Sequence, residues 1–211
     1  MPSCEIAPRK GKMVFVVTVM TVEDTPMTLD AMTERIGDSL RIAPAFVASM
    51  VNTEVGVETT LEARYRRDKG RFVVFTVVNR AIDDEFDPEA LRRATASPIL
   101  RAAIPQCMAI DLERQFSDSQ WVTVSDLAQR EGRLLPDFVT REAVKRGAKQ
   151  ARMEAIQIVY GVNALAGLAP VKAVQEEFGV PHRTASDWIA TARKGGWLEG
   201  MTYAVGRQAE S

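Results

Sequence analysis

Four polar side chains that take part in many reactions lie close together near the C-terminus: His182, Arg183, Ser186 and Asp187. A serine, a histidine and an aspartate make a hydrolytic triad only when they converge on one point, and neighbours along one helix do not converge in this way. His182 is the only histidine of the chain, and with two distant cysteines it cannot make a tetrahedral zinc site. We therefore expect no enzymatic activity, no metal and no cofactor.

The same residue types are suited to reading DNA. Arginine donates two hydrogen bonds to guanine O6 and N7, aspartate accepts from cytosine N4, and serine bonds to several bases. Lys172, Arg193 and Lys194 are better suited to phosphates, which position a protein without reading sequence. The predicted DNA-binding residues are Lys172, His182, Arg183, Thr184, Ser186, Asp187, Ala190, Arg193 and Lys194.

Two short helices are predicted to position these side chains. The first spans 170 to 178, begins at a proline and is closed by Gly179, a residue that readily adopts the left-handed conformation after a helix. The second spans 182 to 194, and its apolar positions recur at helical steps: Ala185, Trp188, Ile189 and Ala192. We expect Phe178 and Trp188 to be core residues. Two short helices joined by a tight turn that contains glycine are typical of a helix-turn-helix.

The segment 167 to 198 also carries a recognisable set of residues: Pro170, Ala173, Val174, Phe178, Gly179, Val180, Thr184, Ala185, Trp188, Ile189, Ala192, Arg193, Gly196 and Leu198. In these positions it resembles a helix-turn-helix module common in uncharacterised proteins of actinobacteria and their phages. The segment 88 to 100 and the stretch before Pro170 resemble the same proteins. The chain departs from the pattern at Trp197 and at Pro181, where a serine or threonine cap is usual. The resemblance implies a DNA-associated role and no established activity.

The rest of the chain predicts the fold class: an α+β N-terminal domain, residues 1 to 138, followed by an all-α helix-turn-helix C-terminal domain, residues 139 to 211. The expected strands span 13 to 21, 55 to 66 and 71 to 79, the last two joined by a polar hairpin turn at 67 to 70. The expected helices before the module span 28 to 41, 88 to 103 and 140 to 166. Asp87 is expected to cap the second of these, which explains the acidic run 83 to 89 without a metal.

Charge is distributed unevenly along a chain whose formal net charge is only -1. Residues 139 to 211 carry 10 Lys and Arg against 7 Asp and Glu, whereas residues 1 to 138 carry 17 against 21. The apolar run at 13 to 20 is too short to span a bilayer. We therefore expect no membrane association. Cys4 and Cys107 are expected to be free thiols, which fits a reducing cytoplasm.

These observations favour a sequence-specific DNA-binding protein, a transcriptional regulator of phage or mobile-element origin. Its partners would be double-stranded DNA and a second copy of the chain, because operators usually pair two half-sites. Dimerisation would belong to the N-terminal domain, through the hairpin at 55 to 79. Two alternatives stay open: a protein-protein docking module such as an inhibitor of a host factor, and a DNA-processing enzyme or accessory protein with an active site upstream.

Overall fold

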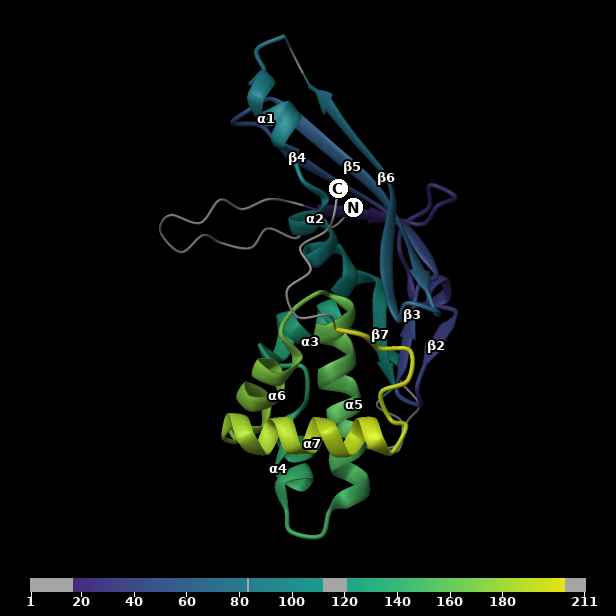
Figure 1. The fold of residues 1–211 in the computed structure, drawn as a ribbon. Coiled ribbons are helices and arrows are strands. Elements are labelled where there is room, and N and C mark those ends of the chain that lie inside the picture. Colours follow the sequence, from purple (N-terminus) through teal and green to yellow (C-terminus); the bar gives the residue numbers. More distant parts are fainter. Residues whose placement is uncertain (1–16, 83, 112–120, 204–211) are drawn as a thin grey trace.

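The fold combines two four-stranded antiparallel sheets with a set of helices, as a computed structural model that describes residues 17–82, 84–111 and 121–203 shows (Figure 1). Its strands are β1 (Val17–Met20), β2 (Glu34–Ile36), β3 (Leu40–Ile42), β4 (Ala45–Asn52), β5 (Val57–Arg66), β6 (Arg71–Ala81), β7 (Met108–Asp111) and β8 (Trp121–Thr123). Its helices are α1 (Pro88–Arg93), α2 (Ala96–Ala103), α3 (Val124–Glu131), α4 (Asp137–Val144), α5 (Lys149–Leu165), α6 (Pro170–Phe178) and α7 (His182–Lys194). Short 3₁₀ helices span Leu29–Ala31 and Ile104–Cys107.

The first sheet has the strand order β1-β4-β5-β6, and β5 and β6 form the hairpin that the sequence predicts. One face of β5 is buried through Val57, Thr59, Leu61 and Ala63, as expected for strict alternation. The turn at 67 to 70 closes with the Gly70 N–H donating to the Arg67 carbonyl oxygen, and Gly70 has a φ of +58°. Strand β4 was not predicted, although it pairs with β5 along its whole length.

The second sheet has the order β2-β3-β7-β8, and its strands β2 and β3 stand where a helix over 28 to 41 was expected, so that prediction is wrong. Gly37, with a φ of +61°, turns the chain back on itself between β2 and β3. Ile36 and Leu40 thereby become direct cross-strand partners, and both are buried. Their spacing of four residues suits a helix face and a tight hairpin equally, so periodicity alone misleads here.

Two long predicted helices are each broken in two. The helix expected over 88 to 103 separates at Ala94 into α1 and α2, while the predicted cap is confirmed, since Asp87 Oδ1 accepts from the Glu89 N–H at 2.8 Å. The helix expected over 140 to 166 separates into α4 and α5 around Gly147, which has a φ of +92°. Glycine in this conformation ends a helix at little cost, whereas it is unfavourable within one.

The predicted fold class, with a separate all-α domain at the C-terminus, is wrong because α5 packs directly on the sheets. Helix α5 is buried on nearly all sides, which marks a helix at the centre of a fold. A Cβ placed on Gly161 of α5 would come within 2.5 Å of Leu40 Cδ1 on β3, so helix and strand are in close contact. The buried residues of the sheets and of α5, α6 and α7 form one hydrophobic cluster. The boundary predicted at residue 138 stays a prediction.

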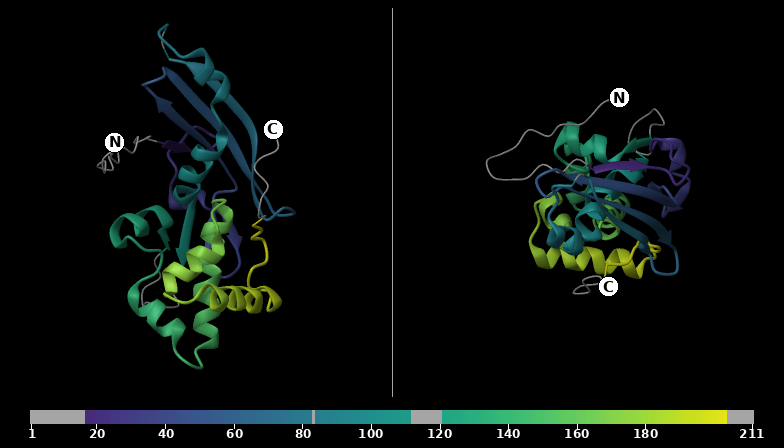
Figure 2. Two further views of the ribbon diagram at one scale, coloured as in Figure 1. Left: turned by 60° about the vertical axis from the view of Figure 1, so that its left-hand side comes forward. Right: turned by 90° about the horizontal axis from the view of Figure 1, so that it is seen from above.

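The first sheet extends away from the helical end of the molecule, whereas the second sheet lies beside α5 (Figures 1 and 2). Helices α4, α6 and α7 surround α5 at that end. In the described segments no helix has both the length and the apolar character that crossing a membrane requires.

Candidate nucleic-acid interface

Helices α6 and α7 form a helical hairpin with the bounds that the sequence predicts. Gly179 ends α6 with a φ of +61°, and nothing lies within 4 Å of where its Cβ would be, so the turn needs glycine for its conformation and not for space. The Val180 N–H then donates to the Gln175 carbonyl oxygen at 3.2 Å. Pro181 precedes α7 without a side-chain cap, and the helix still begins at His182.

The inner face of α7 is held by apolar packing. Ala185, Ile189 and Ala192 are buried, as their spacing predicts. Phe178 of α6 is buried too, and the Trp188 ring meets it edge-on with the centroids 5.9 Å apart. Trp188 itself is only half-buried. The prediction of a core residue is therefore confirmed for Phe178 and holds only in part for Trp188.

Arg152 of α5 explains why Trp188 is not a full core residue. Its guanidinium carbon lies 4.6 Å from the centre of the Trp188 ring, so the indole packs against a cation on that side. The same guanidinium donates to the carbonyl oxygens of Ala143 and Lys145, each at 2.8 Å. Arg152 thus ties α7 to the end of α4 and is engaged within the protein.

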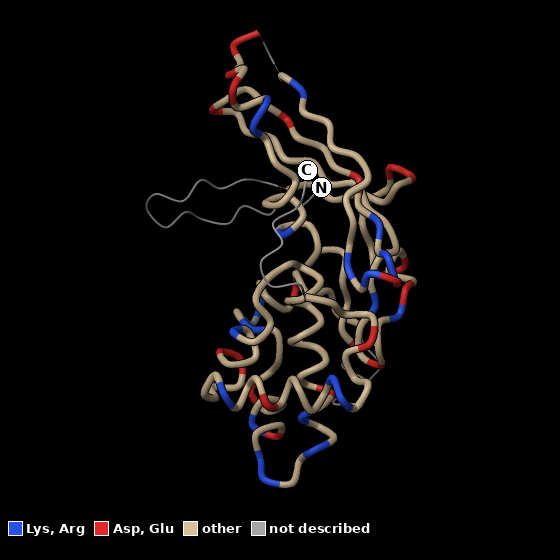
Figure 3. The backbone as a smooth tube through the Cα atoms, in the orientation of Figure 1, with Lys and Arg blue, Asp and Glu red and all other residues tan. Residues whose placement is uncertain are grey.

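The opposite side of α7 presents an exposed row that we call the outer stripe: Arg183, Asp187, Ala190 and Lys194. Their steps of four, three and four residues align them along the helix, away from the buried face. The side chains of Arg183 and Lys194 make no hydrogen bond or ion pair with any other residue that the structure describes. Figure 3 shows basic residues at both ends of α7. The stripe is therefore free to meet a partner.

The remaining predicted DNA-binding residues lie outside this row. Arg193 Nη2 donates to Tyr160 Oη of α5 at 3.0 Å, and its guanidinium lies over the Tyr160 ring. Lys172 of α6 pairs with Glu176 at 3.6 Å, which offsets its charge. Thr184 and Ser186 are half-buried at the flanks of α7, whereas His182 is exposed at its start. The structure thus brings four of the nine predicted residues into one row.

Two further cations, outside the predicted set of nine, lie at the same end of the molecule. Arg146 and Lys149 are exposed in or beside the turn between α4 and α5, and neither has an ion pair with the described residues. Figures 1 and 3 show this turn as a basic tip next to α7. Gly147 was the available signal, since a glycine inside a helical pattern indicates a possible break.

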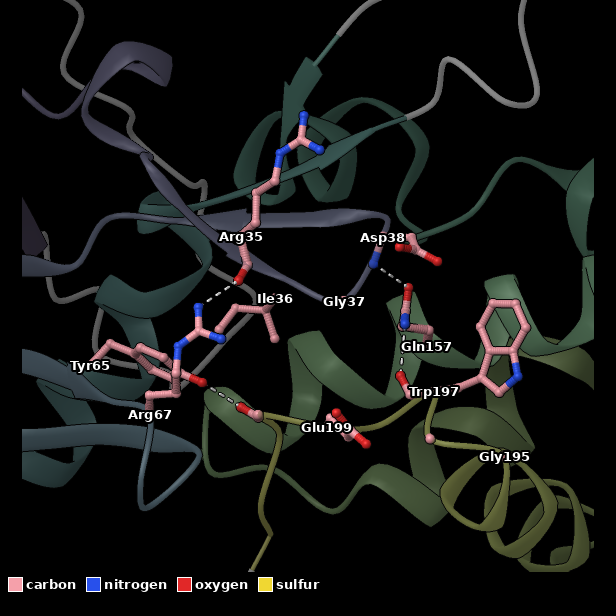
Figure 4. Close-up of a pocket in the computed structure, with 12 residues that line it drawn as sticks. Arg35, Ile36, Gly37, Asp38, Tyr65, Arg67, Gln157, Gly195, Trp197 and Glu199 are labelled. Carbon is pink, nitrogen blue, oxygen red and sulfur yellow. Dashed lines mark hydrogen bonds between the residues drawn. The ribbon is translucent and has the colours of Figure 1, made fainter.

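A cleft of about 510 Å³ lies at the C-terminal end of α7, between the β2–β3 turn, β5, α5 and the segment after α7 (Figure 4). The buried Gln157 side chain spans it, because Oε1 accepts from the Asp38 N–H at 3.2 Å and Nε2 donates to the Trp197 carbonyl oxygen at 2.7 Å. Tyr65 Oη donates to the Gly200 carbonyl oxygen at 2.7 Å. These bonds attach the segment that follows α7 to both sheets.

Burial raises the pKa of two groups above their ordinary values. The pKa of the Tyr65 hydroxyl is raised by burial, so the group stays protonated and keeps its donor to Gly200. Burial likewise raises the pKa of the Cys107 thiol, which leaves it protonated and unreactive at neutral pH. Cys4 lies outside the described residues. Within the described segments, no three His, Cys, Asp or Glu side chains are grouped to hold a metal ion.

The resemblance to actinobacterial and phage modules stays a prediction, because it is a matter of pattern in the residues 167 to 198. No protein-family model, curated protein or solved structure matches the chain.

Proposed function

We propose that this protein is a sequence-specific DNA-binding protein of the cytoplasm that regulates transcription, with α7 as its recognition helix. The observation that supports the proposal is the division of α7 into two faces. Its inner face is packed against α5 and α6, while the outer stripe carries unpaired cations. A helix that reads a major groove must be packed firmly against the protein on one side and carry free polar groups on the other.

The members of the outer stripe suit different parts of that task. Arg183, near the start of α7, would donate two hydrogen bonds to a guanine, and Asp187 one turn later would accept from a cytosine. Ala190 is small enough for the helix to approach the bases closely and to touch a thymine methyl group. Lys194 at the end of α7, with Arg146 and Lys149 in the neighbouring turn, would contact phosphates.

The proposed regulator acts as a homodimer. One recognition helix of this length buries little surface and covers few base pairs, so a single copy would discriminate weakly among sites. Two copies related by a two-fold axis would read two half-sites and so match a palindromic operator.

Arg183→Ala and Lys194→Ala should fail in different ways on a site selected from a random DNA pool. We expect Arg183→Ala to lose about 1 to 3 kcal/mol on that site, with little change on random DNA, because a base contact is lost. Lys194→Ala should weaken both targets alike and lower the salt slope by about one unit, because a phosphate contact is lost. Fluorescence anisotropy titrations at several salt concentrations measure both quantities.

The matched control is Arg101→Ala, which removes an exposed cation of α2, outside the proposed interface. This variant should bind both DNA targets as the parent protein does. If Arg183→Ala kept the full affinity for the selected site in matched salt, α7 would not be the recognition helix.

A further inference from the structure

Strand β6 is a long open edge of the first sheet. It is the last strand in the order β1-β4-β5-β6, and it pairs only with β5. Among the described residues outside β5, no backbone group bonds to the backbone of residues 72 to 81. Within the part of the chain that the structure describes, the other edge strands, β1, β2 and β8, span three or four residues each, against 11 in β6. A row of free backbone donors and acceptors of this length is a template for a further strand.

Strand β6 has only one of the features that usually keep such an edge single, a β-bulge at Phe75 opposite Glu62 and Ala63. Phe75 and Val78 are 52% and 53% exposed, and Val77 is also exposed. No proline and no lysine lies within the strand, and its arginines stand near its two ends. Proteins commonly protect edges with short strands, central lysines or prolines, so a long apolar edge indicates an interface.

The two ends of β6 carry opposite charge. In the hairpin that precedes the strand, Arg66 pairs with Asp68 and Arg67 with Glu34, so the hairpin is basic through the remaining Lys69 and Arg71. The segment that follows the strand is acidic through Asp84, Glu85 and Asp87. Figure 3 shows this acidic group at the far end of the sheet, away from the basic hairpin. Lys69, Arg71 and Asp84 have no ion pair with the residues that the structure describes.

We infer that β6 pairs antiparallel with β6 of a second copy and so forms a continuous eight-stranded sheet across a two-fold axis. Antiparallel pairing sets the basic hairpin of each copy beside the acidic segment of the other, whereas parallel pairing would set like charges side by side. With Val77 opposite the partner's Val77, residues 73 to 81 of the two strands face one another, and the hairpin before each strand lies at the end where the partner's acidic segment follows its own strand. Every other strand pair in both sheets is antiparallel as well.

This interface specifies how the homodimer of the proposed function would form, and in that respect it rests on the proposed function. The observations that support it concern β6 and involve no residue of α7. The test therefore measures association of the full chain without DNA. A protein that dimerises through β6 but binds no DNA would refute the proposed function alone. A protein that binds the selected site yet stays monomeric at all concentrations would overturn the β6 interface alone.

The decisive experiment reverses the charge at one end of β6 at a time. The first variant combines Lys69→Glu with Arg71→Glu, and the second combines Asp84→Lys with Glu85→Lys. Each variant alone should dissociate, with a dimer Kd raised about a hundredfold, because both contacts then bring like charges together. An equimolar mixture should form a heterodimer, since every contact is complementary again. Sedimentation velocity at low salt gives the mass of each sample.

Two outcomes of the charge reversal would overturn the interface: variants that each dimerise as the parent does, or a mixture that stays monomeric. A second pair of variants tests the strand itself. Val78→Lys should abolish the dimer, whereas the control Val51→Lys, at a 43% exposed position on β4, should leave it intact. If Val78→Lys and Val51→Lys dissociated the dimer equally, with circular dichroism spectra unchanged from the parent protein, pairing at β6 would also be refuted.

Discussion

Truncation of Leu40 to alanine should lower the free energy of unfolding by about 2 to 5 kcal/mol and unfold the C-terminal helices in the same transition as the sheets. Leu40 belongs to β3, is fully buried, and lies against Gly161 of α5. The lost side chain would leave a cavity between strand and helix that neither element can fill by itself. Because one hydrophobic cluster spans sheets and helices, we expect the loss to reach α7 as well.

Urea unfolding followed by circular dichroism, for the helices, and by tryptophan fluorescence measures this effect. The matched control is Leu168→Ala, because Leu168 is 43% exposed in the loop between α5 and α6 and should change stability by less than about 1 kcal/mol. Two separate transitions, with the helical signal unchanged by Leu40→Ala, would show that the helices fold independently of the sheets.

Replacement of Phe178 by alanine should lower the free energy of unfolding by about 3 to 5 kcal/mol and weaken the packing of α7 against α6. Phe178 is the buried aromatic residue at the end of α6, directly before the turn that leads into α7. Trp188→Ala should cost less, because Trp188 is half-buried and packs against Arg152 on one side. A buried ring leaves a larger cavity than a half-exposed ring when both are removed.

A double-mutant cycle between Phe178 and Trp188 isolates the contact of the two rings. We expect a coupling energy of about 0.5 to 1.5 kcal/mol from thermal or urea unfolding, the usual range for an edge-to-face aromatic pair. An effect of Trp188→Ala larger than that of Phe178→Ala would mean that α7 is rotated relative to the face described above. The outer stripe would then have to be reassigned.

The parts of the fold that were predictable depend on interactions between near neighbours in the sequence. Gly179, with the apolar spacing on either side of it, determines α6, α7 and the turn between them. The alternation in β5 and the polar turn before β6 determine the hairpin, and Asp87 with Pro88 determines the start of α1. Each of these signals depends on a few consecutive residues, so the surrounding structure has little influence on it.

The sequence by itself thus determined the α6–α7 hairpin and the row of polar residues on α7. Only the tertiary structure decided what that hairpin packs against, because α5 is buried on nearly all sides and its neighbours, β3 among them, are distant in sequence. The same holds for single side chains. Nothing near Arg193 in the sequence indicates its bond to Tyr160, whereas Arg183 stays free because no described element approaches the outer side of α7. Local spacing sets which face a residue occupies, and long-range packing sets which residues on that face remain available to a partner.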